Sequence, residues 1–161
     1  MKQIRIKTIV EEDFNNYKYP SMLIGCISCD FKCCKEYGEN FCQNSELVKS
    51  ETKIMDVESI YKLYNDNKIT KAIVFGGLEP MLQFDEIIDF IEYFRNHGCV
   101  DDIIIYTGYK KNELHYETGI LKGFCNIIIK YGRYIPNQKK HFDDVLGVNL
   151  ASDNQYAERV S

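Results

Sequence analysis

Short apolar runs alternate along the chain with segments of helical periodicity, and this alternation limits the possible folds. The runs predicted as strands cover residues 21–27, 71–75, 103–106 and 125–129. Strand–helix–strand units connect with a right-handed crossover, which lays successive strands parallel. The sequence therefore predicts an α/β fold with a mainly parallel sheet. So few strands cannot close an eight-stranded barrel, and we expect an open or partial (β/α) barrel.

The intervening helices have recognisable ends. Asp56 is a candidate N-cap, and the apolar positions after it are Val57, Ile60, Tyr61 and Tyr64. A second amphipathic helix runs from Phe84 to Phe94 and ends at His97-Gly98. A weaker helix is predicted over 111–121.

Length and charge narrow the class of protein. The 161 residues contain no repeat and no Pro/Gly/Ser linker, so we expect a single domain over 1–161. The net charge is −4 and no Lys/Arg run exceeds two residues, which argues against a nucleic-acid partner. No apolar run approaches the roughly 18 residues of a membrane span. The opening MKQIRIKTIV has no secretory core, which favours a reducing cytoplasm.

Five of the seven cysteines lie between Cys26 and Cys42, directly after the first predicted strand. In a reducing compartment this crowding favours a metal centre over disulfides. Three thiolates can hold a [4Fe–4S] cluster and leave one iron open to a small ligand. Four thiols can instead close a structural zinc site, and Cys26 and Cys34 are rival ligands, so the spacing alone leaves the alternatives open. Cys99 and Cys125 are predicted as buried inert thiols.

Glycines follow the next two predicted strands. Gly76-Gly77 precedes Leu78-Glu79-Pro80, and Thr107-Gly108 follows the third strand. Parallel strands gather their ligand sites at their carboxyl ends, so these turns and the cysteine loop are expected to form one site. An ordinary turn at Gly76-Gly77 and a solvated Glu79 are the alternatives.

The motifs Cys29-Asp30-Phe31-Lys32-Cys33, Phe41-Cys42-Gln43-Asn44, GGLEPMLQ and IIIYTGY resemble those of radical S-adenosylmethionine enzymes. Within that superfamily, the short length, the YTGY run and the Asn154-Gln155 tail most resemble the activating protein of anaerobic (class III) ribonucleotide reductase. The resemblance covers about residues 21–155. Two departures are visible: the third cysteine follows the second after eight residues instead of two, and Leu78 makes GGLEP from GGEP.

The resemblance implies which residues bind the cofactors. The cluster ligands would be Cys29, Cys33 and Cys42, the last chosen because an aromatic residue precedes the family's third cysteine. Gly76 and Gly77 would face the methionine amine of S-adenosylmethionine, with Glu79 and Pro80 shaping the turn. The cluster would be shielded by Phe31 and Phe41, and the nucleoside bordered by Thr107 and Gly108. No side chain beyond the bound cofactors is assigned a catalytic role.

The implied activity is oxidoreductase chemistry: one-electron cleavage of S-adenosylmethionine to a 5′-deoxyadenosyl radical, which installs a glycyl radical on a partner enzyme. The expected partners are an anaerobic ribonucleotide reductase and an electron donor such as flavodoxin or ferredoxin. A radical enzyme acting on a small molecule or another polypeptide is one alternative. A non-catalytic zinc-binding module is the other.

Overall fold

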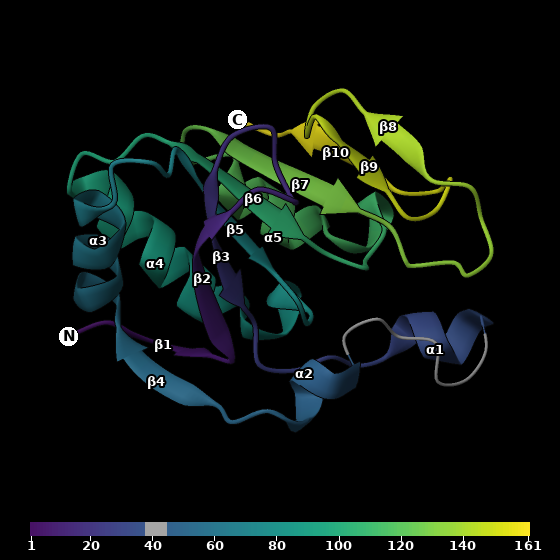
Figure 1. The fold of residues 1–161 in the computed structure, drawn as a ribbon, viewed down its shortest axis with the longest axis horizontal. Helices are drawn as coiled ribbons and strands as arrows, with labels where there is room; N and C mark the ends of the chain where they lie inside the picture. Colours follow the sequence, from purple (N-terminus) through teal and green to yellow (C-terminus); the bar gives the residue numbers. More distant parts are fainter. Residues whose placement is uncertain (38–44) are drawn as a thin grey trace.

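A mixed sheet of six strands lies at the centre of the computed structural model, which describes residues 1–37 and 45–161 (Figure 1). In spatial order the strands are β10 (Tyr156–Arg159), β7 (Ile127–Tyr131), β6 (Asp102–Tyr106), β5 (Ala72–Gly76), β3 (Ser21–Gly25) and β2 (Thr8–Asp13). Each of the four apolar runs predicted as strands forms part of this sheet. The last one, β7, begins and ends two residues later than predicted.

The four middle strands, β3, β5, β6 and β7, run parallel. Phe75 of β5 pairs with Ile24 of β3 and Ile105 of β6, and Ile105 pairs with Ile129 of β7. Every residue of β5 and β7 is buried. Strands buried on both faces need no alternation of polar and apolar residues, which explains the apolar sequence of β5 and the run Ile127–Ile129 in β7.

The outer strands run the other way, and the prediction of a partial (β/α) barrel with a mainly parallel sheet is wrong. β2 pairs antiparallel with β3, and β10 pairs antiparallel with β7. Two further pairs form small antiparallel sheets: β1 (Gln3–Ile6) with β4 (Lys53–Asp56), and β8 (His141–Asp143) with β9 (Val148–Leu150). Antiparallel edge strands end the βα repeat on both sides, so the sheet stays open and mixed.

The predicted helices are confirmed, with adjusted ends. α3 spans Val57–Asp66 and α4 spans Phe84–Asn96, where Gly98 follows the cap with φ +87°. Asp56 is at the N-cap of α3, but its side chain accepts from Gln3 instead of capping the helix. The weaker segment divides into η2 (Lys111–Glu113) and α5 (His115–Leu121). The remaining helices are α1 (Lys32–Tyr37), α2 (Ser45–Lys49) and the 3-10 turn η1 (Pro80–Gln83).

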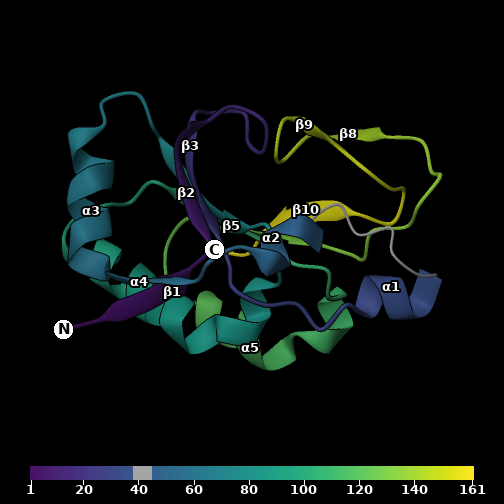
Figure 2. The same ribbon diagram turned by 60° about the horizontal axis from the view of Figure 1, so that its bottom comes forward.

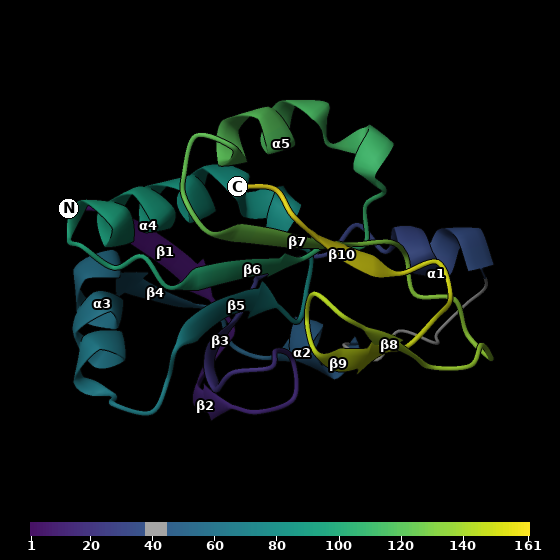
Figure 3. The same cartoon turned by 90° about the horizontal axis from the view of Figure 1, so that it is seen from above.

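The two faces of the sheet are covered differently (Figure 3). Helices α4 and α5 pack on one face, where Phe75, Ile105 and Ile129 join the main core. On the other face Val74, Ile104 and Ile128 pack against Leu146 and Leu150 of the β8–β9 hairpin region. Helices α3 and α1 lie at opposite ends of the molecule (Figure 2). The hairpin covers its face only partly, and a cavity lies beneath it.

Candidate functional site

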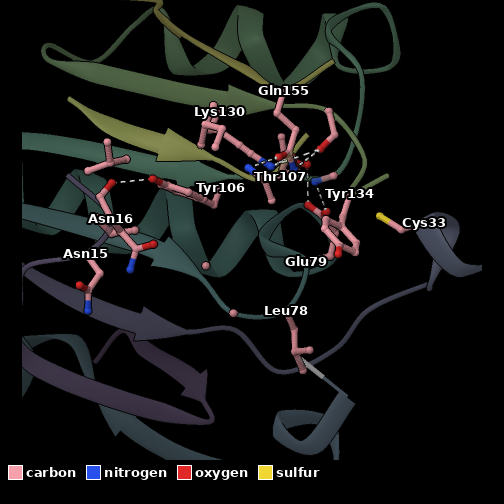
Figure 4. A pocket seen from close by; sticks show the side chains of 18 of the residues that line it. Asn15, Asn16, Cys33, Leu78, Glu79, Tyr106, Thr107, Lys130, Tyr134 and Gln155 are labelled. Atoms are coloured by element: carbon pink, nitrogen blue, oxygen red, sulfur yellow. Dashed lines mark hydrogen bonds between the residues drawn. The ribbon is translucent and has the colours of Figure 1, made fainter. Parts of the chain in front are cut away.

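The loops that follow β3, β5 and β6 meet around a cavity of about 370 Å³ (Figure 4). The β3 loop contributes Cys29 and Cys33, the β5 loop contributes Gly76 to Glu79, and the β6 loop contributes Thr107 and Gly108. Pairing of Gly25 with Gly76, continued by the hydrogen bond from Cys26 N to Gly76 O (2.9 Å), sets the first two loops side by side. The structure thus brings together three segments that are well separated in sequence.

The two described cysteines of the predicted ligand set lie on either side of a sharp bend. Phe31 has φ +56°, a left-handed conformation that is rare outside glycine, and α1 begins at the next residue. The Phe31 amide donates to the Cys29 Sγ at 3.3 Å. Cys33 lies in the first turn of α1, and a Cβ placed on Gly108 would be 3.6 Å from its Sγ. Phe31 itself is half-buried and does not line the cavity.

The predicted third ligand, Cys42, and its neighbour Phe41 lie outside the described residues. Within 1–37 and 45–161, no three His, Cys, Asp or Glu side chains are grouped so that they could hold a metal ion. The assignment of Cys42 therefore remains a prediction. Two thiols at the cavity wall are the donor type that an iron–sulfur cluster requires, and they fit this group.

The other cysteines differ in their surroundings. Cys26 is fully buried in the main core, and burial raises the pKa of its thiol, which disfavours the thiolate that a metal needs. Cys34 does not line the cavity. Cys99 packs against the core but is only partly buried, so the prediction of a buried thiol holds for it in part. Cys125 is exposed, and the prediction is wrong for it.

Glu79 is buried and links two of the loops through hydrogen bonds. The alternative that Glu79 is a solvated surface residue is wrong. Only 6% of the residue is exposed. Its Oε1 accepts from Thr107 Oγ1 (2.7 Å) and from Met81 N (3.0 Å), and its Oε2 accepts from Gly108 N (2.8 Å). Burial raises the pKa of this carboxyl group, while the hydrogen bonds from Thr107 and Gly108 oppose the shift.

The glycine pair divides into two different positions. Gly77 has φ +76°, and a Cβ there would lie 2.6 Å from Leu47 Cδ2 of α2. Gly77 therefore allows a left-handed turn and close packing of α2, and like Gly76 it lines the cavity. At Gly76, the atoms nearest to a Cβ would belong to Tyr106 and Leu23, at ordinary contact distances of 3.5 and 3.8 Å. Pro80 is buried at the first position of η1 and does not line the cavity.

Sequence reasoning missed several residues that shape the site. Gln83 is buried and accepts from Ile27 N (2.8 Å), which joins η1 to the segment before Cys29. Lys130, buried at the end of β7, lines the cavity. A lone lysine beside the apolar run Ile127–Ile129 was the signal available for it. From the Asn154-Gln155 tail, Gln155 lines the cavity and donates to Gly132 O.

Arg133 connects the cysteine helix to the rest of the site. Its guanidinium is 2% exposed and donates to both carboxylate oxygens of Glu113 at 2.8 Å. Its Nε lies 2.9 Å from Glu36 Oε1 in α1, an ion pair without hydrogen-bond geometry. Lys32 of α1 also lies 3.8 Å from Glu113. Helix α1, which bears Cys33, is therefore held by charges from the segment after β7 and from η2.

Fold and site together define a class of protein: a mixed sheet with a cysteine-bearing segment and a cavity at the carboxyl ends of its parallel strands. Residues 22–155 match the family described as 4Fe-4S single cluster domain, and the chain belongs to that family. A [4Fe–4S] cluster is thus its metal group. No curated protein and no solved structure matches the chain significantly. In the described part of the chain, no helix has the length and apolar character needed to cross a membrane.

Proposed function

We propose that this protein is a radical S-adenosylmethionine enzyme that installs a glycyl radical on an anaerobic ribonucleotide reductase. The observation that carries the proposal is the shared cavity: Cys29 and Cys33, the Gly76 turn and the Thr107-Gly108 turn all line it. Family membership supports the cluster and disfavours the zinc alternative. The motifs around these residues support S-adenosylmethionine as the second cofactor.

Cys29, Cys33 and Cys42 would hold the cluster, which would pass on one electron of low potential from a donor such as flavodoxin or ferredoxin. In the proposed reaction this electron would break the C5′–S bond of S-adenosylmethionine. The products are methionine and a 5′-deoxyadenosyl radical. The radical takes a hydrogen atom from the Cα of a glycine, which leaves 5′-deoxyadenosine and a glycyl radical.

The chain's own residues orient and shield the reactants. The buried Glu79 fixes the spacing between the Gly76 and Thr107 turns through three hydrogen bonds. Its oxygens are committed to these donors, so its role is to hold the turns in place. Fixed turns limit motion of the bound reactants, which is how a protein contributes most to cofactor chemistry.

The far end of the cavity suits a polypeptide. Asn15 and Asn16 of the β2–β3 loop lie across the cavity from Cys33 (Figure 4). Asn149 of β9 also lines the cavity. Side-chain amides both donate and accept, as the main chain of an extended segment requires. This arrangement favours a flexible glycine loop as the substrate over an enclosed metabolite.

The test has two stages. Protein reconstituted anaerobically with iron and sulfide is reduced with dithionite, and 5′-deoxyadenosine and methionine are measured by chromatography. We expect equal amounts of both products, and none from the Cys33→Ala variant. Absence of nucleoside from protein with a full cluster would remove the proposed activity.

The second stage adds an anaerobic ribonucleotide reductase. We expect a glycyl-radical doublet in electron paramagnetic resonance and a reductase chain that oxygen cleaves at one site. If the reductase stays radical-free while a small metabolite stimulates deoxyadenosine formation, the substrate assignment is wrong and the radical chemistry stands.

A further inference from the structure

Lys130 places an ammonium group in the wall of the cavity. The residue is 6% exposed and stands on β7 opposite Tyr106 of β6. Its Nζ donates to Thr107 O (3.3 Å) and Gly132 O (3.2 Å). An ammonium carries three N–H groups, and within residues 1–37 and 45–161 these two carbonyls are its hydrogen-bond acceptors. One N–H is left for a group in the cavity.

No carboxylate in the described part of the chain forms an ion pair with Lys130. Glu79 is near enough to act on its charge, but both Glu79 oxygens accept from other donors. Burial lowers the pKa of Lys130 to about 8, whereas the charges of Glu79 and Cys33 act to raise it. In the described part of the chain, the contacts of this buried cation are two carbonyls and the ring of Tyr106, whose centroid is 5.7 Å from Nζ. None of these neutralises its charge, so burying the cation costs stability, and an apolar side chain of similar length would avoid this penalty.

We propose that Lys130 binds a carboxylate in the cavity and, resting on the proposed function, that this is the α-carboxylate of S-adenosylmethionine. Lys130 donates a hydrogen bond to Thr107 O. Gly108, the residue after Thr107, lies beside Cys33. A carboxylate held here is therefore on the cysteine side of the cavity. One compact cation matches one negative charge. A phosphate would call for additional donors, and the nearby Gly108 amide already donates to Glu79.

The competing explanation is structural: Lys130 would merely offset the buried charge of Glu79. The two explanations predict different effects of a Lys130 substitution on the affinity for a ligand that lacks the carboxylate. Affinities of S-adenosylmethionine and of its decarboxylated analogue are therefore measured by equilibrium binding on anaerobically reconstituted wild-type, Lys130→Met and Lys111→Met proteins. Lys111 is an exposed lysine paired with Glu158, and its variant is the control.

Lys130→Met is expected to weaken S-adenosylmethionine binding by about 10-fold to 100-fold, the range for one hydrogen bond to a charged group. Its affinity for the decarboxylated analogue should equal that of wild type, and its iron content should be unchanged. Equal losses for both ligands, or no loss for either, would overturn the carboxylate assignment. Wild-type protein that binds neither ligand would instead refute the proposed function, and this inference with it.

If the Lys130→Met variant does not fold, Lys130→Gln replaces it in the binding measurements. Its side-chain amide can still donate a hydrogen bond to one of the two carbonyls that Lys130 contacts. It should lose the preference for the carboxylate-bearing ligand in the same way. A Lys130→Gln protein that discriminates the two ligands as wild type does would also overturn the assignment.

Discussion

Arg133 and Glu113 form a two-point ion pair, with Nη1 and Nη2 each 2.8 Å from a carboxylate oxygen, twenty residues apart in the chain. The same guanidinium lies 2.9 Å from Glu36 of α1. Planar two-point pairing fixes direction as well as distance. Arg133 therefore ties the helix that bears Cys33 to the segment after β7, and the longer Lys32–Glu113 pair (3.8 Å) adds a second link.

Replacement of this side chain should loosen the cysteine helix. Arg133→Met removes the cation that pairs with Glu113 and Glu36. We expect a loss of about 1–3 kcal/mol in the free energy of unfolding. The loss is below that of a fully buried pair because both carboxylates are partly exposed. Iron should also be lost faster to a chelator, measured by absorbance. Arg159→Met, which breaks the pair with Asp102 away from the cysteines, is the control and should leave the iron-loss rate unchanged. Equal rates in both variants would contradict this role of Arg133.

The same pair predicts a pH dependence. Hydrogen bonding to Arg133 lowers the pKa of Glu113 from its ordinary 4.5 to about 2. A lowered carboxyl pKa contributes stability that is present above pH 4.5 and is lost as the pH falls toward 2. Urea unfolding of the cluster-free chain should therefore show wild type more stable than Glu113→Gln at pH 6, with the difference shrinking below pH 4.5. A constant difference across that window would refute the pairing.

Glu79→Gln should disturb the Gly76 and Thr107-Gly108 turns without creating a cavity, because the two side chains are similar in size. The amide NH2 that replaces one carboxylate oxygen must face an N–H or O–H donor, because all three partners of Glu79 donate. We expect a loss of about 1–3 kcal/mol in unfolding free energy. Under the proposed function, S-adenosylmethionine binding should weaken while iron content is kept. Stability equal to wild type would mean that Glu79 does not brace the loops.

The two glycines should respond differently to alanine. Gly77→Ala forces a side chain into φ +76° and against Leu47, so we expect a loss of at least about 1–2 kcal/mol in stability. Gly76→Ala meets no close contact and should fold normally. Under the proposed function it should weaken S-adenosylmethionine binding, because the added methyl stands at the cavity wall. Thermal unfolding and binding assays on both variants check this division.

The cysteines should separate by iron retention. Alanine variants of Cys29, Cys33 and Cys42 should lose the cluster, whereas variants of Cys26 and Cys34 should retain it. Cys26→Ala should lower stability, since its thiol is packed in the main core. Iron analysis and visible absorbance after anaerobic reconstitution measure the outcome. Full iron in Cys42→Ala together with loss in Cys34→Ala would reverse the choice of third ligand.

The central strands and the main helices could be predicted because their signals are local. A run such as Ile103–Ile105 is buried on both faces and is apolar throughout, and the helical positions of α4 repeat with one periodicity. The order of these elements also places the cysteine loop and the glycine turns at the same ends of parallel strands. The sequence alone thus determined which loops meet.

The edges of the sheet and the buried charges were decided by tertiary structure. β10 is short and carries a mixed sequence, and its pairing with β7 joins residues far apart in the chain. Likewise, nothing near Glu79 or Arg133 in sequence shows that they are buried, because their partners come from other loops. The apolar run before Lys130 hints at its burial but not at its partners. A charged side chain is stable in such a place only when distant donors and acceptors converge on it, and that convergence exists only in the folded chain.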